Sequence, residues 1–425
     1  MNLREDVLDV ISFAIERVLP DRAVKDAILR EGLGKLKNVG LVAIGKAAWR
    51  MAKAAKEALG EVLKWGIVIT KYKHSLGEIE GVEIYEAGHP IPDENTLYAT
   101  KRVLEKVSSL KEGDNLLFLV SGGGSALFEY PLEGISLEDL KRVNELLLKS
   151  GADIVEMNTV RKHISAVKGG RFAKAVYPAF IYSLILSDVL GDRLDSIASG
   201  PAYPDETTYA DALKVIDKYG LKDKMPSSVL NILERGVSGE VDETPKRLDN
   251  VKSVIIGSVS LACRYAIERA KFLGYNTLFL TSTLNCEASE AGRFIAEILK
   301  EIKRSSNPIS PPCMIVLGGE TVVHVRGNGK GGRSQELALS SAISLRGERG
   351  VVVAAVGTDG TDGPTDAAGG MVDGESFERM LLNGVDPERA LLDNDSYNAL
   401  KASGDLIITG PTGTNVNDIV IGAVI

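Results

Sequence analysis

Asn115-Leu-Leu-Phe-Leu-Val120 is followed at once by Ser121-Gly-Gly-Gly-Ser125. The first six residues form a short apolar run, which is typical of a strand buried on both faces of a sheet. Three successive glycines then remove side chains, so that backbone N–H groups can converge on an anion. A tight turn between a strand and a helix needs only one glycine. This stretch therefore predicts an α/β sheet with an anion-binding loop at the carboxyl end of a strand.

The same succession of apolar run, turn and helix recurs along the chain of 425 residues. We predict strands at 39–44, 65–70, 115–120 and 180–187, and then at 251–258, 276–281, 313–317 and 351–356. A further strand is expected at 321–325. Strands that alternate with helices are typical of largely parallel or mixed sheets covered by helices. The predicted fold class is therefore α/β, with two α/β domains.

Residues 202–250 separate the two series of strands and are richer in polar residues and prolines. We expect short helices there and place the domain boundary near residue 245. The N-terminal domain, Rossmann-like, would span 1–245, including an amphipathic first helix, and the C-terminal domain would span 246–425.

Composition argues against several classes of function. The net charge is −8 and there is no long basic block, which disfavours a nucleic-acid partner. No apolar run is long enough to span a bilayer, and the N-terminus lacks the apolar core of a signal peptide. We therefore expect a cytoplasmic protein without a membrane partner. Gln335 is the only glutamine while Glu and Lys are plentiful, a bias seen in thermophilic proteins.

Three motifs of the first half place charge beside glycine or at a strand end. Lys46 follows Gly45 at a predicted helix start, where free N–H groups and the ammonium would both favour an anion. The segment 158–171 gathers basic side chains beside Gly169 and Gly170, although a solvated helix face explains Lys162 alone. The predicted substrate or phosphate ligands here are Ser121, Gly122, Gly123, Gly124, Ser125, Asn158, Arg161 and Lys168.

Asp188 comes directly after the predicted strand at 180–187, and Asp192 lies four residues further on. Mg²⁺ prefers one or two carboxylates together with waters and phosphate oxygens, so both residues are candidate metal ligands. Either carboxylate could instead cap the following helix.

The second half carries two further motifs. Residues 327–332 match G-x-G-x-x-G, but Lys330 and Arg333 crowd the motif, and exposed amides beside them suit a triphosphate better than a dinucleotide. After the strand at 351–356, three carboxylates spaced three and four apart could hold a divalent cation or position a hydroxyl. The segment 409–418 is a further loop rich in glycine and threonine. A plain hairpin or surface loop explains it almost as well as a role in the site does. The candidate site residues in this half are Lys330 for phosphate binding, Arg333 for catalysis, and Glu320 and Asp359 for metal binding.

Seven blocks taken in order resemble the MOFRL-type glycerate kinases, and the resemblance covers essentially the whole chain: GKAAWRM, SGGGSALF, NTVRKHISAVKGGRFA, SDVLGDRLDSIASGP, LGGETVVHVRGNGKGGRSQELAL, GTDGTDGPTDAAG and TGPTGTNVNDI. The resemblance implies two α/β domains with the active site in the interdomain cleft. It also implies ATP-dependent phosphorylation of D-glycerate, usually at the 2-hydroxyl. Lys46 and Arg333 match the catalytic basic residues of the family. Members of this group have also been labelled hydroxypyruvate reductases.

The predicted function is therefore that of a glycerate 2-kinase using ATP and Mg²⁺ or another divalent cation. Lys46 and Arg333 would act on the phosphoryl group and the substrate carboxylate, and Asp188 is a candidate catalytic residue that could accept the hydroxyl proton. An NAD(P)H-dependent hydroxypyruvate reductase and a non-catalytic sugar-acid-phosphate sensor stay open. The usual symmetry of soluble enzymes favours a homodimer. The predicted metal ligands are Asp188, Asp192, Glu320 and Asp359.

Overall fold

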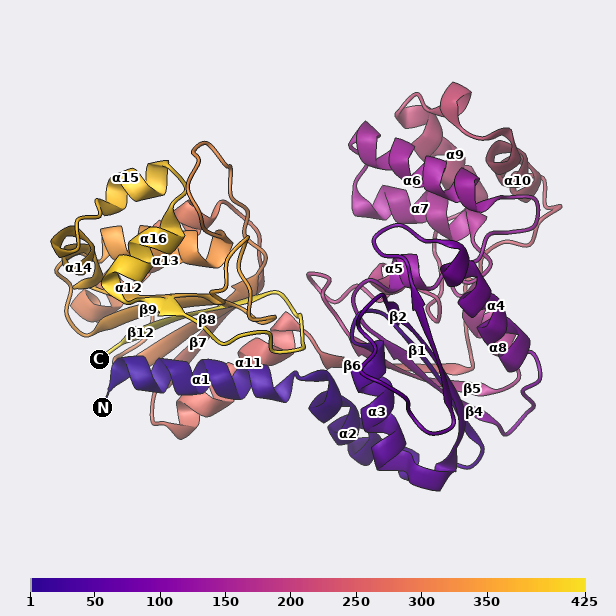
Figure 1. Cartoon of the computed structure of the whole chain (residues 1–425), viewed down its shortest axis with the longest axis horizontal. Coiled ribbons are helices and arrows are strands. Elements are labelled where there is room, and N and C mark those ends of the chain that lie inside the picture. Colours follow the sequence, from indigo (N-terminus) through magenta and orange to yellow (C-terminus); the bar gives the residue numbers. More distant parts are fainter. Residues whose placement is uncertain (1) are drawn as a thin grey trace. The chain divides into compact units, whose positions relative to one another are not determined.

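The computed structural model describes residues 2–425, which form two compact units (Figure 1). One unit comprises residues 20–256, and the other combines the N-terminal segment up to Leu19 with residues 257–425. Each unit contains a six-stranded sheet with helices packed against it. The predicted fold class of two α/β domains is therefore confirmed.

In the unit of residues 20–256 the strand order is β3-β2-β1-β4-β5-β6. The pairs from β3 to β5 are parallel, and β1 and β4 are almost fully buried, which explains their unbroken apolar sequence. The chain runs outward from β1 to β3 on one side and from β4 to β6 on the other, so the order reverses between β1 and β4. The strands are β1 (Val39–Ile44), β2 (Leu63–Lys71), β3 (Val82–Ala87), β4 (Asn115–Val120), β5 (Phe180–Leu186) and β6 (Val251–Gly257).

The helices of this unit fall into two groups. The first group packs against or beside the sheet and comprises α2 (Pro20–Arg30), α3 (Ala48–Leu59), α4 (Glu94–Val107), α5 (Gly124–Leu127) and α8 (Arg171–Val176). The second forms a separate layer with its own apolar core, and Figure 1 shows its four helices grouped together. Its members are α6 (Leu137–Ser150), α7 (Ile154–Ile164), α9 (Tyr209–Lys218) and α10 (Ser227–Val237). The short helices predicted within 202–250 are thus α9 and α10.

The sheet of the other unit is mixed, with the order β11-β10-β9-β12-β8-β7. The last strand, β12, lies between β8 and β9 and is antiparallel to both. Its strands are β7 (Asn276–Leu284), β8 (Cys313–Gly319), β9 (Val351–Gly357), β10 (Gly369–Asp373), β11 (Leu406–Ile407) and β12 (Asp418–Val424). Its helices are α1 (Leu3–Arg17), α11 (Val259–Phe272), α12 (Ala288–Ser305), α13 (Arg333–Ser344), α14 (Ser376–Leu382), α15 (Pro387–Leu392) and α16 (Ser396–Ser403).

The segment 321–325 was expected to be a strand, but only Val322 forms a β-bridge, with Glu287. The other residues of this segment follow β8 as irregular chain along a cavity wall. A segment that follows a cavity wall in this way, outside the sheet, lacks the continuous ladder of hydrogen bonds that defines a strand.

The division between the units differs from the boundary placed at 245. β6 still joins the parallel sheet, so the first unit ends at residue 256. Helix α1 belongs to the second unit, because its apolar face packs on α11 and against β12. Arg4 adds hydrogen bonds to the Met371 carbonyl and to Asp405, both 2.9 Å long. Sequence order gives no indication that the first helix completes the last domain.

Among the described residues, none of the helices combines the length and the apolar character needed to cross a bilayer.

Candidate functional site

The carboxyl ends of β1, β4 and β5 bring three predicted segments together. After β1, the Lys46 N–H donates to the Gly122 carbonyl at 2.9 Å, and the next N–H donates to the Ser121 hydroxyl at 3.1 Å. After β5, the Asp188 carboxylate lies directly against Gly122, where a methyl group would overlap it. Lys46, the loop 121–125 and Asp188 are therefore neighbours. They lie at the point where the strand order reverses, which is where open α/β sheets bind ligands.

The Lys46 side chain has a distinctive environment. Within residues 2–425, its ammonium has no hydrogen-bond or ion-pair partner. A methyl group on Gly123 would lie 3.4 Å from its Cγ and 2.9 Å from the His89 ring, so both side chains converge on this glycine. Burial lowers the pKa of His89, and the charge of Lys46 lowers it further, so the imidazole is neutral near pH 7. Lys46 is thus an uncompensated positive charge beside the glycine loop.

The two serines of this loop are engaged within the protein. The Ser121 hydroxyl donates to the Ile44 carbonyl at 3.2 Å and is almost fully buried. The Ser125 hydroxyl lies 3.1 Å from that of Ser199, which in turn donates to Asn158 at 3.0 Å. Ser121 therefore joins the ends of β1 and β4, and anion binding by the loop would rest on its backbone.

Lys168 was predicted to be a phosphate ligand, but the structure gives it a different role. It is 1% exposed, and its ammonium donates to the carbonyls of Ser125 and Phe128 at 2.7 and 3.0 Å. It also pairs with Glu129 at 3.1 Å. An ammonium has three N–H donors, and three acceptors surround this one. Lys168 therefore holds the end of the loop 121–125 in place.

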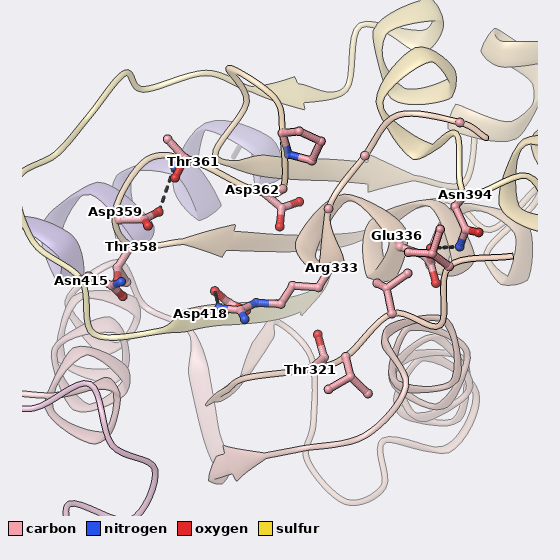
Figure 2. Close-up of a pocket in the computed structure, with 18 residues that line it drawn as sticks. Thr321, Arg333, Glu336, Thr358, Asp359, Thr361, Asp362, Asn394, Asn415 and Asp418 are labelled. Carbon is pink, nitrogen blue, oxygen red and sulfur yellow. Dashed lines mark hydrogen bonds and ion pairs between the residues drawn. The ribbon is translucent and has the colours of Figure 1, made fainter. Parts of the chain in front are cut away.

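In the other unit, two carboxylates hold Arg333, the first residue of α13, and Figure 2 shows one of them, Asp418, beside it. Its Nε and Nη2 donate to the Asp418 carboxylate at 2.6 and 3.1 Å, and its Nη1 donates to Glu320 at 2.7 Å. Arg333 and Asp418 line a cavity of about 730 Å³. A guanidinium fixed in this way is pre-oriented toward whatever the cavity holds.

Asp418 was overlooked in the sequence, although it directly precedes the apolar run of β12. Burial raises the pKa of Asp418 to about 7, the nearby Asp362 and Glu320 act in the same direction, and Arg333 opposes them. The carboxylate thus titrates near neutrality and its charge state governs how firmly Arg333 is held. The only sequence signal was an acidic residue at the start of a wholly buried strand.

Asp362 has a related role at the start of α13. Its carboxylate accepts from the backbone N–H groups of Ser334 and Gln335 at 3.2 and 2.8 Å. The Gln335 amide donates to the same carboxylate at 2.9 Å. Burial raises the pKa of Asp362. The single glutamine of the chain therefore helps to fix the helix that begins with Arg333.

The glycine loop 327–332 differs from its prediction. Its amides were expected to be exposed to a triphosphate, but several already donate within the protein. The Gly327 N–H donates to Asn394 at 3.0 Å, the Gly329 N–H to the Asp393 carbonyl at 2.9 Å and the Lys330 N–H to Asp395 at 3.0 Å. The Lys330 ammonium lies 4.3 Å from the centre of the Tyr397 ring. This part of the loop is a structural turn and does not form a nucleotide nest.

The predicted metal ligands do not form a cage. Among residues 2–425, no three His, Cys, Asp or Glu side chains converge as a metal site would require. Glu320 is engaged by Arg333, whereas Asp359, at the cavity wall, accepts from the Thr361 N–H at 2.9 Å. Mg²⁺ needs only one or two protein carboxylates when phosphate oxygens supply the rest. Asp188 and Asp359 fit that requirement, and the predicted roles of Asp188, Asp192, Glu320 and Asp359 stay predictions.

Comparison with known proteins covers the whole chain. Residues 6–234 match a family model described as a domain of unknown function, DUF4147, and residues 313–418 match the MOFRL family. A D-glycerate 2-kinase of Thermotoga maritima is 56% identical over 424 residues, covering 100% of this chain and 99% of the relative. A glycerate 2-kinase of Pyrococcus horikoshii is 46% identical over 435 residues, covering 100% and 98%.

The same resemblance holds in three dimensions. The crystal structure of a glycerate kinase from Thermotoga maritima superposes with a TM-score of 0.94 at 56% identity, covering 100% of this chain and 99% of that one. Thermotoga maritima and Pyrococcus horikoshii are both thermophiles, which agrees with the scarcity of glutamine in this sequence. The chain therefore belongs to the MOFRL-type glycerate kinase family, as its sequence blocks predicted.

Proposed function

We propose that this protein is an ATP-dependent kinase that phosphorylates D-glycerate at the 2-hydroxyl, giving 2-phosphoglycerate and ADP. One observation carries the proposal: an unpaired ammonium, a glycine loop and a carboxylate meet where the strand order of a parallel sheet reverses. The relative from Thermotoga maritima, which is 56% identical over its full length, bears the name D-glycerate 2-kinase.

Phosphoryl transfer asks a protein mainly to position two substrates and to neutralise developing negative charge. Lys46 would supply a mobile positive charge to the transferred group, because nothing in its own unit binds its ammonium. Arg333 would supply a fixed one, since Asp418 and Glu320 hold its guanidinium. Asp188 could hold Mg²⁺ or accept the proton of the attacking hydroxyl. When bound, Mg²⁺ would neutralise phosphate oxygens of ATP.

The test is an assay of the purified protein with D-glycerate, ATP and Mg²⁺, in which ADP, 2-phosphoglycerate and 3-phosphoglycerate are followed separately. We expect ADP and 2-phosphoglycerate in equal amounts. A parallel reaction with hydroxypyruvate and NADH should show no loss of NADH. ADP formation coupled to 3-phosphoglycerate would correct the position of transfer, and loss of NADH would support the reductase instead. A chelator should abolish turnover, and added Mg²⁺ should restore it.

Size-exclusion chromatography with light scattering would test the predicted homodimer, which stays a prediction, as does the cytoplasmic location. The predicted meeting of the residues of the two units in one cleft also stays a prediction. If both sets are needed, variants of Lys46 and of Arg333 should each lose turnover while the substrates still bind.

A further inference from the structure

A second cavity lies wholly within the unit of residues 20–256 and has a volume of about 720 Å³. Helix α6 forms one wall, and the turn at His89–Pro92 and the loop 121–125 contribute others. Arg161 on α7 and Lys168 also line it. Gly123, on which Lys46 and His89 converge, belongs to the same lining, so the cavity is continuous with the glycine loop.

Arg161 is a charged group of this cavity wall that the protein leaves incompletely bonded. Its Nε donates to the Asn144 side chain at 2.6 Å. Within the described chain, its two terminal nitrogens have no hydrogen-bond or ion-pair partner. Burial lowers the pKa of Arg161, and Glu129 opposes that shift. Arg161 is half-buried, and a partly desolvated guanidinium whose outer nitrogens lack acceptors gains most from a ligand that supplies them.

Among the described residues, the surrounding charges leave Arg161 as a cation of this wall without an ion-pair partner of its own. Lys168 and Glu129 pair with each other at 3.1 Å and so cancel. Arg142 and Glu145, on α6 at the rim, pair at 3.1 Å and are each about half exposed. An anion that enters the cavity would therefore be attracted to Arg161 more than to any of these paired groups.

The chemistry of Arg161 favours a carboxylate. A guanidinium offers its two outer nitrogens as a planar fork that matches the two oxygens of a carboxylate. The hydrogen bond that Nε donates to the Asn144 Oδ1 fixes the plane of this fork and leaves its outer edge available. Asn158 lies one turn earlier on α7, and its buried Nδ2 also has no partner among residues 2–425. Its Oδ1 is joined through Ser199 to Ser125 of the cavity wall.

We propose that Arg161 binds the carboxylate of the hydroxy-acid substrate and selects acids over uncharged polyols. Lys46 and the loop 121–125 then serve the phosphoryl group alone. This inference rests on the proposed function, because it identifies the carboxylate with that of D-glycerate.

The experiment compares Arg161→Met with Arg142→Met, which removes the paired arginine at the rim of the same cavity. Steady-state kinetics would give KM for D-glycerate, KM for ATP and kcat/KM for methyl D-glycerate, whose carboxylate is masked. For Arg161→Met we expect KM for D-glycerate to rise roughly 30-fold or more, as for loss of one desolvated charge pair. KM for ATP should not change, and the preference for the acid over its ester should collapse. Arg142→Met should keep that preference.

Three outcomes would overturn the inference. The first is a raised KM for ATP with an unchanged KM for D-glycerate, which would assign Arg161 to the nucleotide phosphates. The second is an equal effect of Arg142→Met, which would show a general effect of charge. The third is an intact preference for the acid in a folded Arg161→Met protein. If Arg161→Met does not fold, Arg161→Lys serves instead, because it keeps the charge and loses the fork.

Failure of the proposed function can be told apart from failure of this inference. Isothermal titration of D-glycerate into the wild-type protein and into Arg161→Met requires no turnover. Binding to the wild type that is lost in the variant supports the carboxylate subsite even if no phosphoryl transfer occurs. Equal binding to both proteins, or no binding to either, overturns it.

Discussion

The two basic residues matched to the family's catalytic pair are held in opposite ways. Lys46 follows a parallel strand and has no side-chain partner within the described residues, whereas Arg333 begins a helix and donates to both Asp418 and Glu320. The loop beside Lys46 consists mainly of glycine, and the cavity beside Arg333 is lined by carboxylates, with Glu336, Asp359, Asp362 and Asp418 among them.

This difference shows two routes to the same electrostatic task. A free ammonium on a flexible stem can follow an anion as it moves, but it is ordered only when the anion arrives. A guanidinium held by two carboxylates is already ordered, so it stabilises developing charge without reorganisation. Loss of the two residues should therefore have different effects. Loss of Lys46 should lower catalysis alone, and loss of Arg333 should lower both catalysis and stability.

The largest effect should come from Lys46→Ala. We expect kcat to fall by about 10²–10³-fold, which is typical when one preorganised donor to a developing charge is removed. The melting temperature should stay close to that of the wild type, because no contact of the ammonium is lost. Coupled ADP assays and thermal unfolding followed by circular dichroism would measure both quantities.

Lys53→Ala on α3, the helix that follows Lys46, is the matched control, since Lys53 is exposed and its one ion pair among the described residues is with Glu57, at 3.9 Å. It should keep normal turnover. Near-normal turnover in Lys46→Ala would remove Lys46 from the mechanism, and a large loss of stability would mean that it holds the fold.

Arg333→Met should lose activity to a similar or smaller degree and also lose stability. Breaking a fully buried ion pair costs roughly 3–5 kcal/mol, and less is expected here because the Arg333 side chain is 31% exposed. The loss should be greater at pH 8 than at pH 6, because a protonated Asp418 no longer needs a counter-ion. Urea unfolding at both pH values would measure it.

Arg346→Met is the control for that measurement, because Arg346 forms an exposed pair with Glu378 in the same unit. Surface pairs contribute little to stability, so its unfolding should change little at either pH. If Arg333→Met were as stable as this control at pH 8, the pair with Asp418 would have no structural role.

Much of the glycine-loop region could be predicted from the sequence, and less of the Arg333 region. Lys46 and the loop 121–125 follow directly from buried strands, so the parallel sheet brings them together at one edge. Arg333 depends on Asp418, which lies 85 residues away on an antiparallel strand inserted between two others. No local pattern reports such a contact, and the carboxylate instead appeared as part of a surface loop.

Lys168 and the amides of the loop near Lys330 differ from their predictions for a common physical reason, whereas the role of the Lys330 side chain stays a prediction. Lys168 and Lys330 were chosen because a basic side chain beside glycines can bind phosphate. The sequence does not show which donors the fold itself uses. The ammonium of Lys168 donates to buried carbonyls and pairs with Glu129. Amides of the loop near Lys330 donate to Asp393, Asn394 and Asp395.

Gly122→Ala should give a moderate effect that sharpens the Lys46 side of the comparison. Its methyl group would overlap the Asp188 carboxylate and force that side chain away from the loop. We expect kcat to fall about tenfold, as when a supporting contact of a functional carboxylate is lost. Gly34→Ala is the matched control, because Gly34 has open space around it and no unusual backbone angle. Equal kinetics in the two variants would mean that the position of Asp188 does not matter for turnover.

The smallest effect should be a pH dependence that Asp418 gives to the Arg333 side. Its folded pKa of about 7 lies above the usual carboxyl value of 3.8, so the folded protein binds a proton that the unfolded chain releases between these values. The stability that this proton contributes is fully present below about pH 4 and is lost as the pH rises to 7. Activity should rise over the upper part of that range, since only the ionised carboxylate holds Arg333 firmly.

Asp418→Asn separates these two trends. The variant should lose the part of the slope of unfolding free energy against pH that arises between pH 4 and 7, and its residual activity should vary less between pH 6 and 8. Identical slopes in the two proteins would show that the Asp418 carboxyl titrates as an ordinary exposed acid. Opposite pH trends in stability and activity, both removed by one substitution, are expected where a buried charge is retained for function at a cost in stability. Lys46→Ala should leave both trends in place, because Asp418 is unchanged in that variant and the Lys46 ammonium has no acidic partner among the described residues.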